Sequence, residues 1–231
     1  MTTRPLLNAD LGEEPLELAR DEALAELVDV LNIACGGHAG DTSSMARFAA
    51  LASRPGGLLA AHPSYPDRPN FGRVRMNIQP QALAESLRSQ LRALKMAAGE
   101  TPIAWVKPHG ALYHAAMTDA AVAHALLDAA RDVSPGAAIV TQAGPVGDAL
   151  AQICADRGTR VVREAFADRR LDDDGRLLPR TDPRALITDP REALEHATRL
   201  WSALQFDTLC VHADTPNALA IVRELRRSIG G

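Results

Sequence analysis

The chain has 231 residues, of which 46% are hydrophobic and 23% are charged, a composition that is ordinary for an enzyme domain. Its net charge of −4, without a cluster of lysine and arginine, argues against nucleic acid and an anionic membrane surface as partners. No apolar run approaches the roughly 20 residues of a membrane span, and the acidic N-terminus lacks the apolar stretch of a signal peptide, so we expect a cytoplasmic protein.

Short apolar runs alternate with longer amphipathic stretches along the chain. We predict strands at residues 6–10, 30–34, 57–61, 103–107, 137–142, 159–164 and 207–212. We predict helices at residues 17–28, 41–53, 80–98, 119–133, 145–157, 190–204 and 214–228. Asp41 and Asp119 are placed to cap helices, and Pro80, Pro145 and Pro190 to lie in first turns.

This alternation predicts an α/β protein with a parallel sheet, either open or closed into a barrel. Because no composition shift or flexible linker divides the chain, we expect residues 1–231 to form one domain. The two longest irregular segments, 63–77 and 165–183, are rich in Asp, Arg, Pro and Gly. Loops of that length in a compact fold often act as functional lids.

Polar residues gather where the predicted strands end. Four of the seven histidines lie at such positions, together with carboxylates, amides and cations; the set is Asn8, Asp10, Glu13, His38, His62, Lys107, His109, Glu164, Asp168, Arg169, His212 and Asp214. In parallel α/β folds, ligands bind at the carboxyl ends of the strands, where the connecting loops converge. The pattern therefore indicates an enzyme.

Lys107 closes an apolar strand, so its ammonium is expected to point into the cleft, where it could bind a phosphate or neutralise an oxyanion. An ion pair with Asp10 or Glu164 is the structural alternative, and the two are compatible. Asp67 and Arg73, in the first long loop, either clamp an anionic group or belong to a solvated loop.

A divalent metal is a further hypothesis. Asp10, His62 and His109 follow three different strands, and one carboxylate with two imidazoles suits Zn²⁺, Fe²⁺ or Mn²⁺. No HxxxH or HExxH spacing supports the site, however. The chain also lacks GxxxxGK[ST] and GxGxxG, so a nucleotide would need another mode of binding.

The polar residues sit in a series of sequence blocks: LNADLGE (7–13), NIACG (32–36), HAGD (38–41), AHPSYPD (61–67), NFGR (70–73), VKPHGALY (106–113), EAFADR (164–169) and CVHADTP (210–216). In these blocks and in their order, the chain resembles the LamB/YcsF family, whose members are A subunits of 5-oxoprolinase. The resemblance implies an irregular seven-stranded (β/α) barrel of the glycoside hydrolase/deacetylase type. It also implies that the chain works with B and C partner subunits, using ATP with Mg²⁺, to hydrolyse the small lactam 5-oxo-L-proline to L-glutamate.

Under this hypothesis, Lys107 faces the developing oxyanion or the transferred phosphate, and Asp10 with Glu13 acts as base or metal ligand. His38, His62 and His109 transfer protons or complete a metal site. The remaining candidates bind substrate or phosphate: Asn8, His62, Asp67, Arg73, Glu164, Asp168, Arg169, His212 and Asp214. Of these, we expect Glu164, Asp168 and Arg169 to lie on a mobile loop that closes over the substrate.

The chain departs from the family pattern at Gly37, where Phe is usual, and at Ala213 and Arg184, where Gly is usual. The segments after Glu13 and between Trp201 and Thr208 are shorter than usual, which could change the choice of substrate. Two alternatives remain open: a stand-alone metal-dependent deacetylase or amidase, and a non-catalytic subunit that presents the substrate to its partners. Fold analogy alone cannot separate them.

Overall fold

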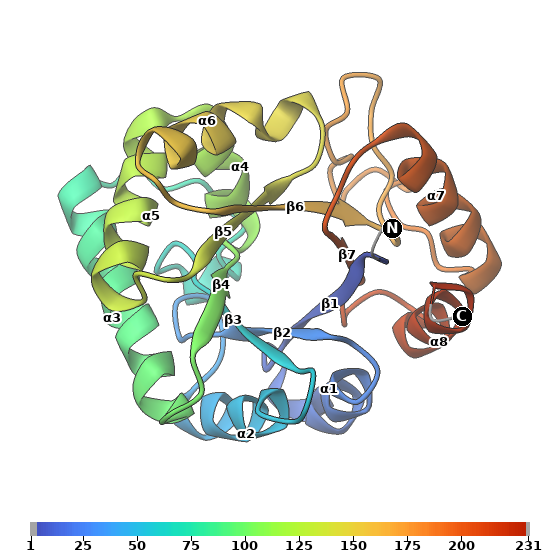
Figure 1. Ribbon diagram of the computed structural model, residues 1–231, viewed down its shortest axis with the longest axis horizontal. Coiled ribbons are helices and arrows are strands. Elements are labelled where there is room, and N and C mark those ends of the chain that lie inside the picture. The colour runs from blue at the N-terminus through green and yellow to red at the C-terminus, as the bar shows by residue number, and fades with distance from the viewer. Residues whose placement is uncertain (1–3, 230–231) are drawn as a thin grey trace.

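The computed structural model describes residues 4–229, which form a closed barrel of seven parallel strands surrounded by helices (Figure 1). The strands follow one another around the barrel in sequence order: β1 (Leu6–Leu11), β2 (Val30–Ala34), β3 (Leu58–His62), β4 (Ile103–Val106), β5 (Ala138–Gln142), β6 (Val161–Phe166) and β7 (Thr208–Cys210). The helices are α1 (Leu18–Ala25), α2 (Thr42–Ala52), α3 (Pro80–Ala98), α4 (Gly110–Thr118), α5 (Ala120–Val133), α6 (Asp148–Asp156), α7 (Pro190–Ala203) and α8 (Ala218–Ile229). The expected α/β barrel is confirmed, in its closed form.

The predicted strands and helices are all present, with small shifts at their ends. β4 ends at Val106 and β7 at Cys210, so Lys107 and His212 follow their strands rather than belonging to them. Asp41 and Asp119 cap α2 and α5 through their side chains, as predicted. The predicted helix 145–157 is a 3-10 turn, Pro145–Gly147, followed by α6.

Helix α4 was not predicted. It begins with Gly110, a poor helix former, and His109 at its N-cap offers no side-chain hydrogen bond to the first turn. The usual start signals are therefore missing. Its buried face, which includes Leu112, Tyr113 and Met117, stabilises the helix through packing instead.

The interior of the barrel is apolar at one end and polar at the other. A small buried cluster of Val30, Ala60, Trp105, Ala138, Val140 and Val162 is separate from the larger core that contains most of the helix-packing residues. Side chains two positions apart on a strand point to the same side. Val30 and Asn32 therefore share the inward side of β2. Lys107, the residue directly after β4, points to the same side as Trp105. The inward positions nearest the carboxyl ends are thus where polar residues meet.

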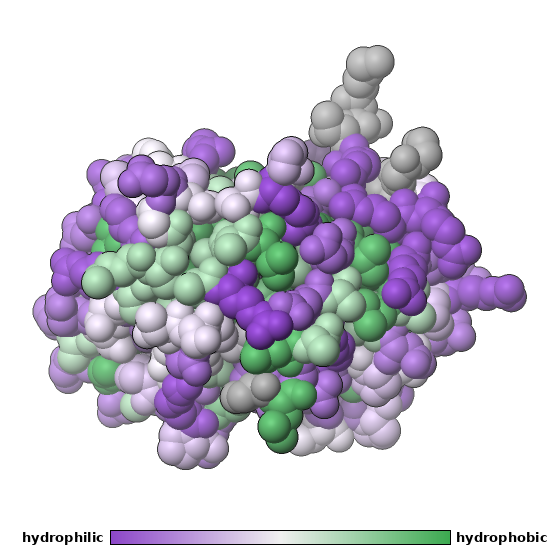
Figure 2. Space-filling model, turned by 90° about the horizontal axis from the view of Figure 1, so that it is seen from below, coloured by the Kyte–Doolittle hydropathy of each residue, from purple (hydrophilic) through white to green (hydrophobic). Residues whose placement is uncertain are grey.

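The outer surface mixes polar and apolar residues. Figure 2, which views the molecule from the side of α1 and α2, shows hydrophilic residues interspersed with hydrophobic patches. No helix within residues 4–229 is both long and apolar enough to cross a membrane.

Asp29 holds the two ends of the described chain together beside the β1–β7 closure. Its carboxylate accepts hydrogen bonds from the Leu7 backbone N–H at 2.8 Å and from the guanidinium groups of Arg4 and Arg226. Burial alone would raise the pKa of Asp29, but these partners outweigh it and lower the pKa. Arg4 precedes β1 and Arg226 lies in α8, so one carboxylate ties both segments to the barrel.

We therefore expect Asp29→Ala to reduce the free energy of unfolding by about 2–4 kcal/mol, because it leaves a buried N–H and two guanidinium groups without their acceptor. Urea denaturation at neutral pH measures the change. Asp132→Ala, which removes an exposed carboxylate paired with Arg88, is the matched control and should cost less than about 1 kcal/mol. Equal losses for the two variants would contradict the role of Asp29.

Candidate functional site

A cavity of about 610 Å³ opens at the carboxyl ends of the strands. Asp10, His62, Lys107 and His212 line its floor, and α4 contributes Tyr113, His114 and Met117 to one wall. Residues 176–180 of the second long loop, together with Arg73, Arg75 and Arg169, also line the cavity. The sequence-based expectation that the strand ends share one site is consistent with this arrangement.

Lys107 is the centre of a buried network that crosses the barrel. Its Nζ lies 2.9 Å from Asp10 Oδ1, 2.9 Å from Glu164 Oε1, 3.2 Å from Asn8 Oδ1 and 3.1 Å from Cys210 Sγ. These partners come from β1, β6 and β7, so the contacts run through the barrel interior. We call Asn8, Asp10, Lys107, Glu164 and Cys210 the lysine cluster.

In the lysine cluster, Asp10 and Lys107 each stabilise the charged form of the other. Burial alone would lower the pKa of Lys107, but the nearby acids, Asp10 foremost, outweigh it and hold the pKa well above its usual value. Burial would raise the pKa of Asp10, but His62 and Lys107 reverse this and lower it. For Glu164 burial prevails and raises the pKa. The ion pair that we predicted as the structural alternative for Lys107 is therefore present, and it involves both Asp10 and Glu164.

Glu164 is incompletely satisfied despite its ion pair. Within the described residues, neither carboxylate oxygen has a hydrogen bond of good geometry, and the buried Tyr113 hydroxyl also has none. Burial raises the pKa of Tyr113 well above its usual value, so the phenol keeps its proton. Buried polar atoms of this kind are costly unless a ligand or water satisfies them.

Asp168 and His212 form a second element of the site. The Asp168 carboxylate accepts from the His212 backbone N–H at 2.9 Å and lies 3.1 Å from its Nδ1. Burial would raise the pKa of Asp168, but His212 outweighs it and lowers the pKa. A carboxylate only accepts, so Nδ1 carries the proton and Nε2 of a neutral His212 is a free acceptor. This Nε2 lies 3.9 Å from Asp10 Oδ2, and His212 lines the cavity.

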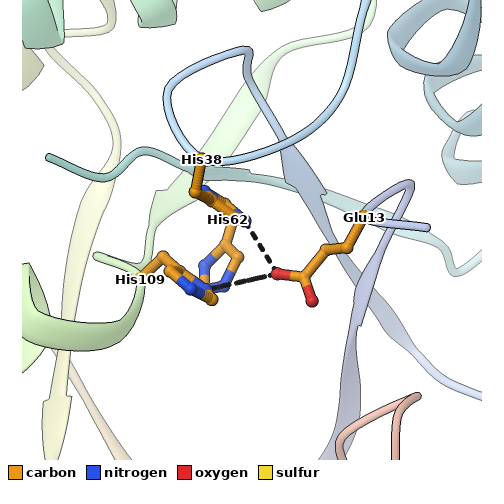
Figure 3. A group of neighbouring side chains, drawn as sticks. All are labelled: Glu13, His38, His62 and His109. Atoms are coloured by element: carbon orange, nitrogen blue, oxygen red, sulfur yellow. Dashed lines mark hydrogen bonds and ion pairs between the residues drawn. The ribbon is translucent and has the colours of Figure 1, made fainter. Parts of the chain in front are cut away.

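Three histidines and a glutamate form the histidine cluster: Glu13, His38, His62 and His109 (Figure 3). The Glu13 Oε1 lies 2.8 Å from His38 Nε2, 3.2 Å from His109 Nδ1 and 3.6 Å from His62 Nε2. The rings of His38 and His109 stack with their centroids 3.6 Å apart. Burial lowers the pKa of His62 to about 3, so this imidazole is neutral at physiological pH.

Gly72 allows the first long loop to pass over the histidine cluster. Its φ of +63° favours glycine, and a Cβ there would lie 3.0 Å from His38 Cβ and 3.2 Å from His109 Cδ2. The carbonyl of the preceding residue, Phe71, lies 3.0 Å from His109 Nε2. The loop thus approaches the histidines closely enough to hold one of them by its backbone.

Within residues 4–229, two groups of side chains have the spacing of metal ligands. One is the histidine cluster, and the other consists of Asp10, Cys210 and His212. The predicted trio of Asp10, His62 and His109 is divided between these two groups: the histidines belong to the first and Asp10 to the second. One oxygen of Asp10 contacts Lys107, and the other lies 3.5 Å from His62 Nε2. The structure thus contains candidate ligands for a divalent metal, but they are not the three residues predicted from the sequence.

At the rim, Asp214 connects the two long loops. Its carboxylate pairs with Arg73 at 2.9 Å and with Arg180 at 3.0 Å. Arg169, which is buried beneath the rim, donates to the Leu178 carbonyl at 2.7 Å, and its Nε has no hydrogen-bond partner among the described residues. The rim therefore offers several guanidinium groups to an anionic ligand.

The expectation that Glu164, Asp168 and Arg169 lie together on a mobile loop is wrong in part. Glu164 lies within β6, and Asp168 is fully buried and held by His212 and Thr215. Only Arg169 belongs to the cavity wall beside the loop. Asp67 bonds Asn70 and does not line the cavity, and Asp214 acts on the cavity through the two arginines.

Several residues of the site were missed. Asn32 donates to both Asn8 Oδ1 and Asp10 Oδ1, at 2.7 and 2.8 Å. Its position in the apolar run Val-Leu-Asn-Ile-Ala was a usable signal, because a polar residue in a buried strand needs partners. Cys210, Tyr113 and Arg180 gave no comparable signal, since their partners are distant in sequence.

Comparisons with known proteins agree over nearly the whole chain. The family model described as "LamB/YcsF family" matches residues 6–230. The A subunit of 5-oxoprolinase from Methylococcus capsulatus is 42% identical, over 96% of this chain and 91% of that protein. The protein of the same name from Limosilactobacillus fermentum is 35% identical, over 98% of this chain and 95% of that protein.

A solved structure is also similar to this chain over nearly its whole length. The crystal structure of a lactam utilization protein from Thermus thermophilus superposes with a TM-score of 0.87 at 34% sequence identity. The match covers 99% of this chain and 96% of that one. The barrel, the strand-end site and these full-length similarities agree: the chain belongs to the LamB/YcsF family.

Proposed function

We propose that this chain is the A subunit of a 5-oxoprolinase and that its cavity opens the lactam ring of 5-oxo-L-proline to give L-glutamate. The observation that carries the proposal is the full-length similarity to proteins named as A subunits of 5-oxoprolinase in different bacteria. The cavity supports it chemically, because it combines a fixed ammonium, a histidine with a free acceptor nitrogen and an arginine-rich rim.

Lys107 stabilises the charge that develops on the lactam oxygen. Water attacks the ring carbonyl carbon, and the carbonyl oxygen gains negative charge as the new C–O bond forms. An ammonium that is already held in place interacts with this charge without reorganising, which is the main advantage of a preorganised site. Asp10 and Glu164 keep Lys107 protonated and in position.

His212 transfers the protons. Its Nε2 accepts a proton from the attacking water, and the imidazolium returns it to the ring nitrogen as the C–N bond breaks. The products are the free amine and the γ-carboxylate of glutamate. Asp168 holds the tautomer that leaves Nε2 free, and it stabilises the imidazolium.

The guanidinium groups of Arg73, Arg169 and Arg180 bind the α-carboxylate of 5-oxoproline. Arginine recognises carboxylates through paired N–H donors, and the Nε of Arg169 has a donor to offer. Asp214 holds Arg73 and Arg180 at the rim before the substrate arrives.

ATP with Mg²⁺ and the B and C subunits belong to the same proposal through the family resemblance. An unactivated lactam is a poor electrophile. Transfer of the γ-phosphoryl group of ATP to its carbonyl oxygen, with ADP as the leaving group, makes the carbon a better target for water, and Lys107 then faces the oxygen that carries the phosphate. Ring opening by the first water leaves the phosphate on the γ-carboxyl group, and a second water releases it as inorganic phosphate. The sequence contains neither a GxxxxGK[ST] nor a GxGxxG motif, so we assign nucleotide binding to the partner subunits.

A stand-alone metal-dependent amidase is the second candidate, and the histidine cluster, of which Glu13, His62 and His109 line the cavity, favours it. In that case the isolated chain would hydrolyse an amide without ATP and without partners. Glutamate release from 5-oxoproline, measured with the chain alone and with the B and C subunits, each with and without ATP, separates the two. Release that requires all components supports the proposal.

We expect Lys107→Ala to lower ATP-dependent glutamate release by the reconstituted complex by at least about 100-fold, because the oxyanion loses its fixed cation. The chain has one other lysine, Lys95, which lies in α3 and donates to the Val133 carbonyl. Lys95→Ala is the matched control and should keep wild-type activity. A folded Lys107→Ala protein, verified by circular dichroism, that keeps full activity would refute the assignment.

We expect Asp168→Asn and His212→Gln each to lower kcat by about 10²–10⁴-fold with little change in KM, because both disable the same proton transfer. The double variant should be no slower than the worse single variant, since the two residues act as a unit. Steady-state kinetics of the complex gives these values. Multiplicative losses would show that the residues act independently.

A further inference from the structure

We infer that the histidine cluster binds one first-row divalent metal ion, with Glu13 Oε1, His38 Nε2, His62 Nε2 and His109 Nδ1 as its ligands. This inference does not rest on the proposed function, because it concerns the binding of an ion by the chain itself. It also differs from the ligand trio predicted from the sequence, since Glu13 and His38 take the place of Asp10.

Backbone carbonyls fix the tautomers of two of the histidines. The Nδ1 of His62 lies 2.8 Å from the Lys107 carbonyl oxygen, and the Nε2 of His109 lies 3.0 Å from the Phe71 carbonyl oxygen. A carbonyl oxygen only accepts hydrogen bonds, so these two nitrogens carry the protons. The other nitrogens, His62 Nε2 and His109 Nδ1, then present lone pairs.

These two lone pairs face each other. His62 Nε2 and His109 Nδ1 are 3.0 Å apart, and the Glu13 carboxylate lies beside both. Three acceptors that converge on one point repel one another unless a cation lies between them. The backbone contacts that fix the outer nitrogens are also the ones that typically orient metal-bound histidines.

His38 completes the set. Its imidazole is buried, with Nε2 2.8 Å from Glu13 Oε1 and with Nδ1 lacking a hydrogen-bond partner in residues 4–229. Without an outer partner, the proton is free to lie on Nδ1 and leave Nε2 as a ligand. The stacked rings of His38 and His109 point their inner nitrogens toward the same carboxylate (Figure 3).

The spacing fits a small ion. In a tetrahedral zinc site with bonds of 2.0–2.1 Å, neighbouring ligand atoms are separated by about 3.3 Å. The separations measured within the cluster include 2.8, 3.0, 3.2 and 3.6 Å, and all four ligand atoms lie within 4.8 Å of one another. Three imidazoles and one carboxylate suit Zn²⁺ or Co²⁺, whereas Mg²⁺ and Ca²⁺ prefer oxygen ligands.

The second group of candidate ligands, Asp10, Cys210 and His212, is not suited to binding a metal ion. Asp10 and Cys210 lie 2.9 and 3.1 Å from the Lys107 ammonium, which already supplies a positive charge to that group. Burial also raises the pKa of Cys210 well above its usual value, so its sulfur stays protonated. Among the described residues, the histidine cluster has no such internal cation, because Lys107 pairs with Asp10 and Glu164 rather than with Glu13.

The test is metal binding by the full chain after chelation and dialysis, measured by calorimetric titration with Zn²⁺ and by visible absorption with Co²⁺. We expect one ion per chain, the ligand-field bands of four-coordinate Co²⁺ and a higher thermal midpoint with Zn²⁺. His109→Gln and the conservative Glu13→Gln should each weaken Zn²⁺ binding by at least about 10–100-fold. Two variants are used so that one folding defect does not decide the result.

His124→Gln is the matched control, because His124 is an exposed residue of α5 and should leave the stoichiometry and affinity unchanged. The absence of saturable binding by the folded wild-type chain would overturn the inference and indicate a proton shared between His62 and His109. Wild-type affinity in both the His109→Gln and Glu13→Gln proteins would also overturn it, by placing the ion elsewhere.

Discussion

The ion pairs of Lys107 inside the barrel are the constraint around which the site is arranged. A buried ammonium and two buried carboxylates each cost free energy unless they are paired. Lys107 contacts Asp10 on one side and Glu164 on the other, so three charges are accommodated at once. Asn8 and Asn32 supply further hydrogen bonds around Asp10 and Lys107. These contacts therefore fix the positions of the charged side chains at the polar end of the barrel.

The same constraint connects the lysine cluster with the histidine cluster. Asp10 uses Oδ1 for Lys107 and turns Oδ2 toward His62 at 3.5 Å and His212 at 3.9 Å. One carboxylate thus lies between the ammonium, the histidine cluster and the Asp168–His212 pair. A change at any of these positions therefore alters the electrostatic surroundings of the others.

Sequence reasoning placed the strands well because apolar runs in a parallel barrel are buried on both faces and stand out. It also gathered Asp10, His62, Lys107, His109 and His212 at one end of the sheet. It chose Asp10 as the carboxylate partner of His62 and His109 and did not find Glu13 in that place, because Glu13 lies in the loop after β1 and its direction depends on the folded loop. It ended the sixth strand at Glu164 and assigned this residue to a mobile loop, although two further residues of β6 follow it.

The closure between β1 and β7 has a consequence for the biosynthesis of the protein. Asn8 donates to Thr208, 200 residues away, so the first strand emerges from the ribosome long before its last partner exists. Contacts of such sequence separation slow folding. Until β7 is made, Asn8 and Asp10 lack one wall of the barrel and remain accessible to water. Closing the barrel and assembling the buried polar cluster are thus a single late event, and a nascent chain that lacks its last segment has no assembled site.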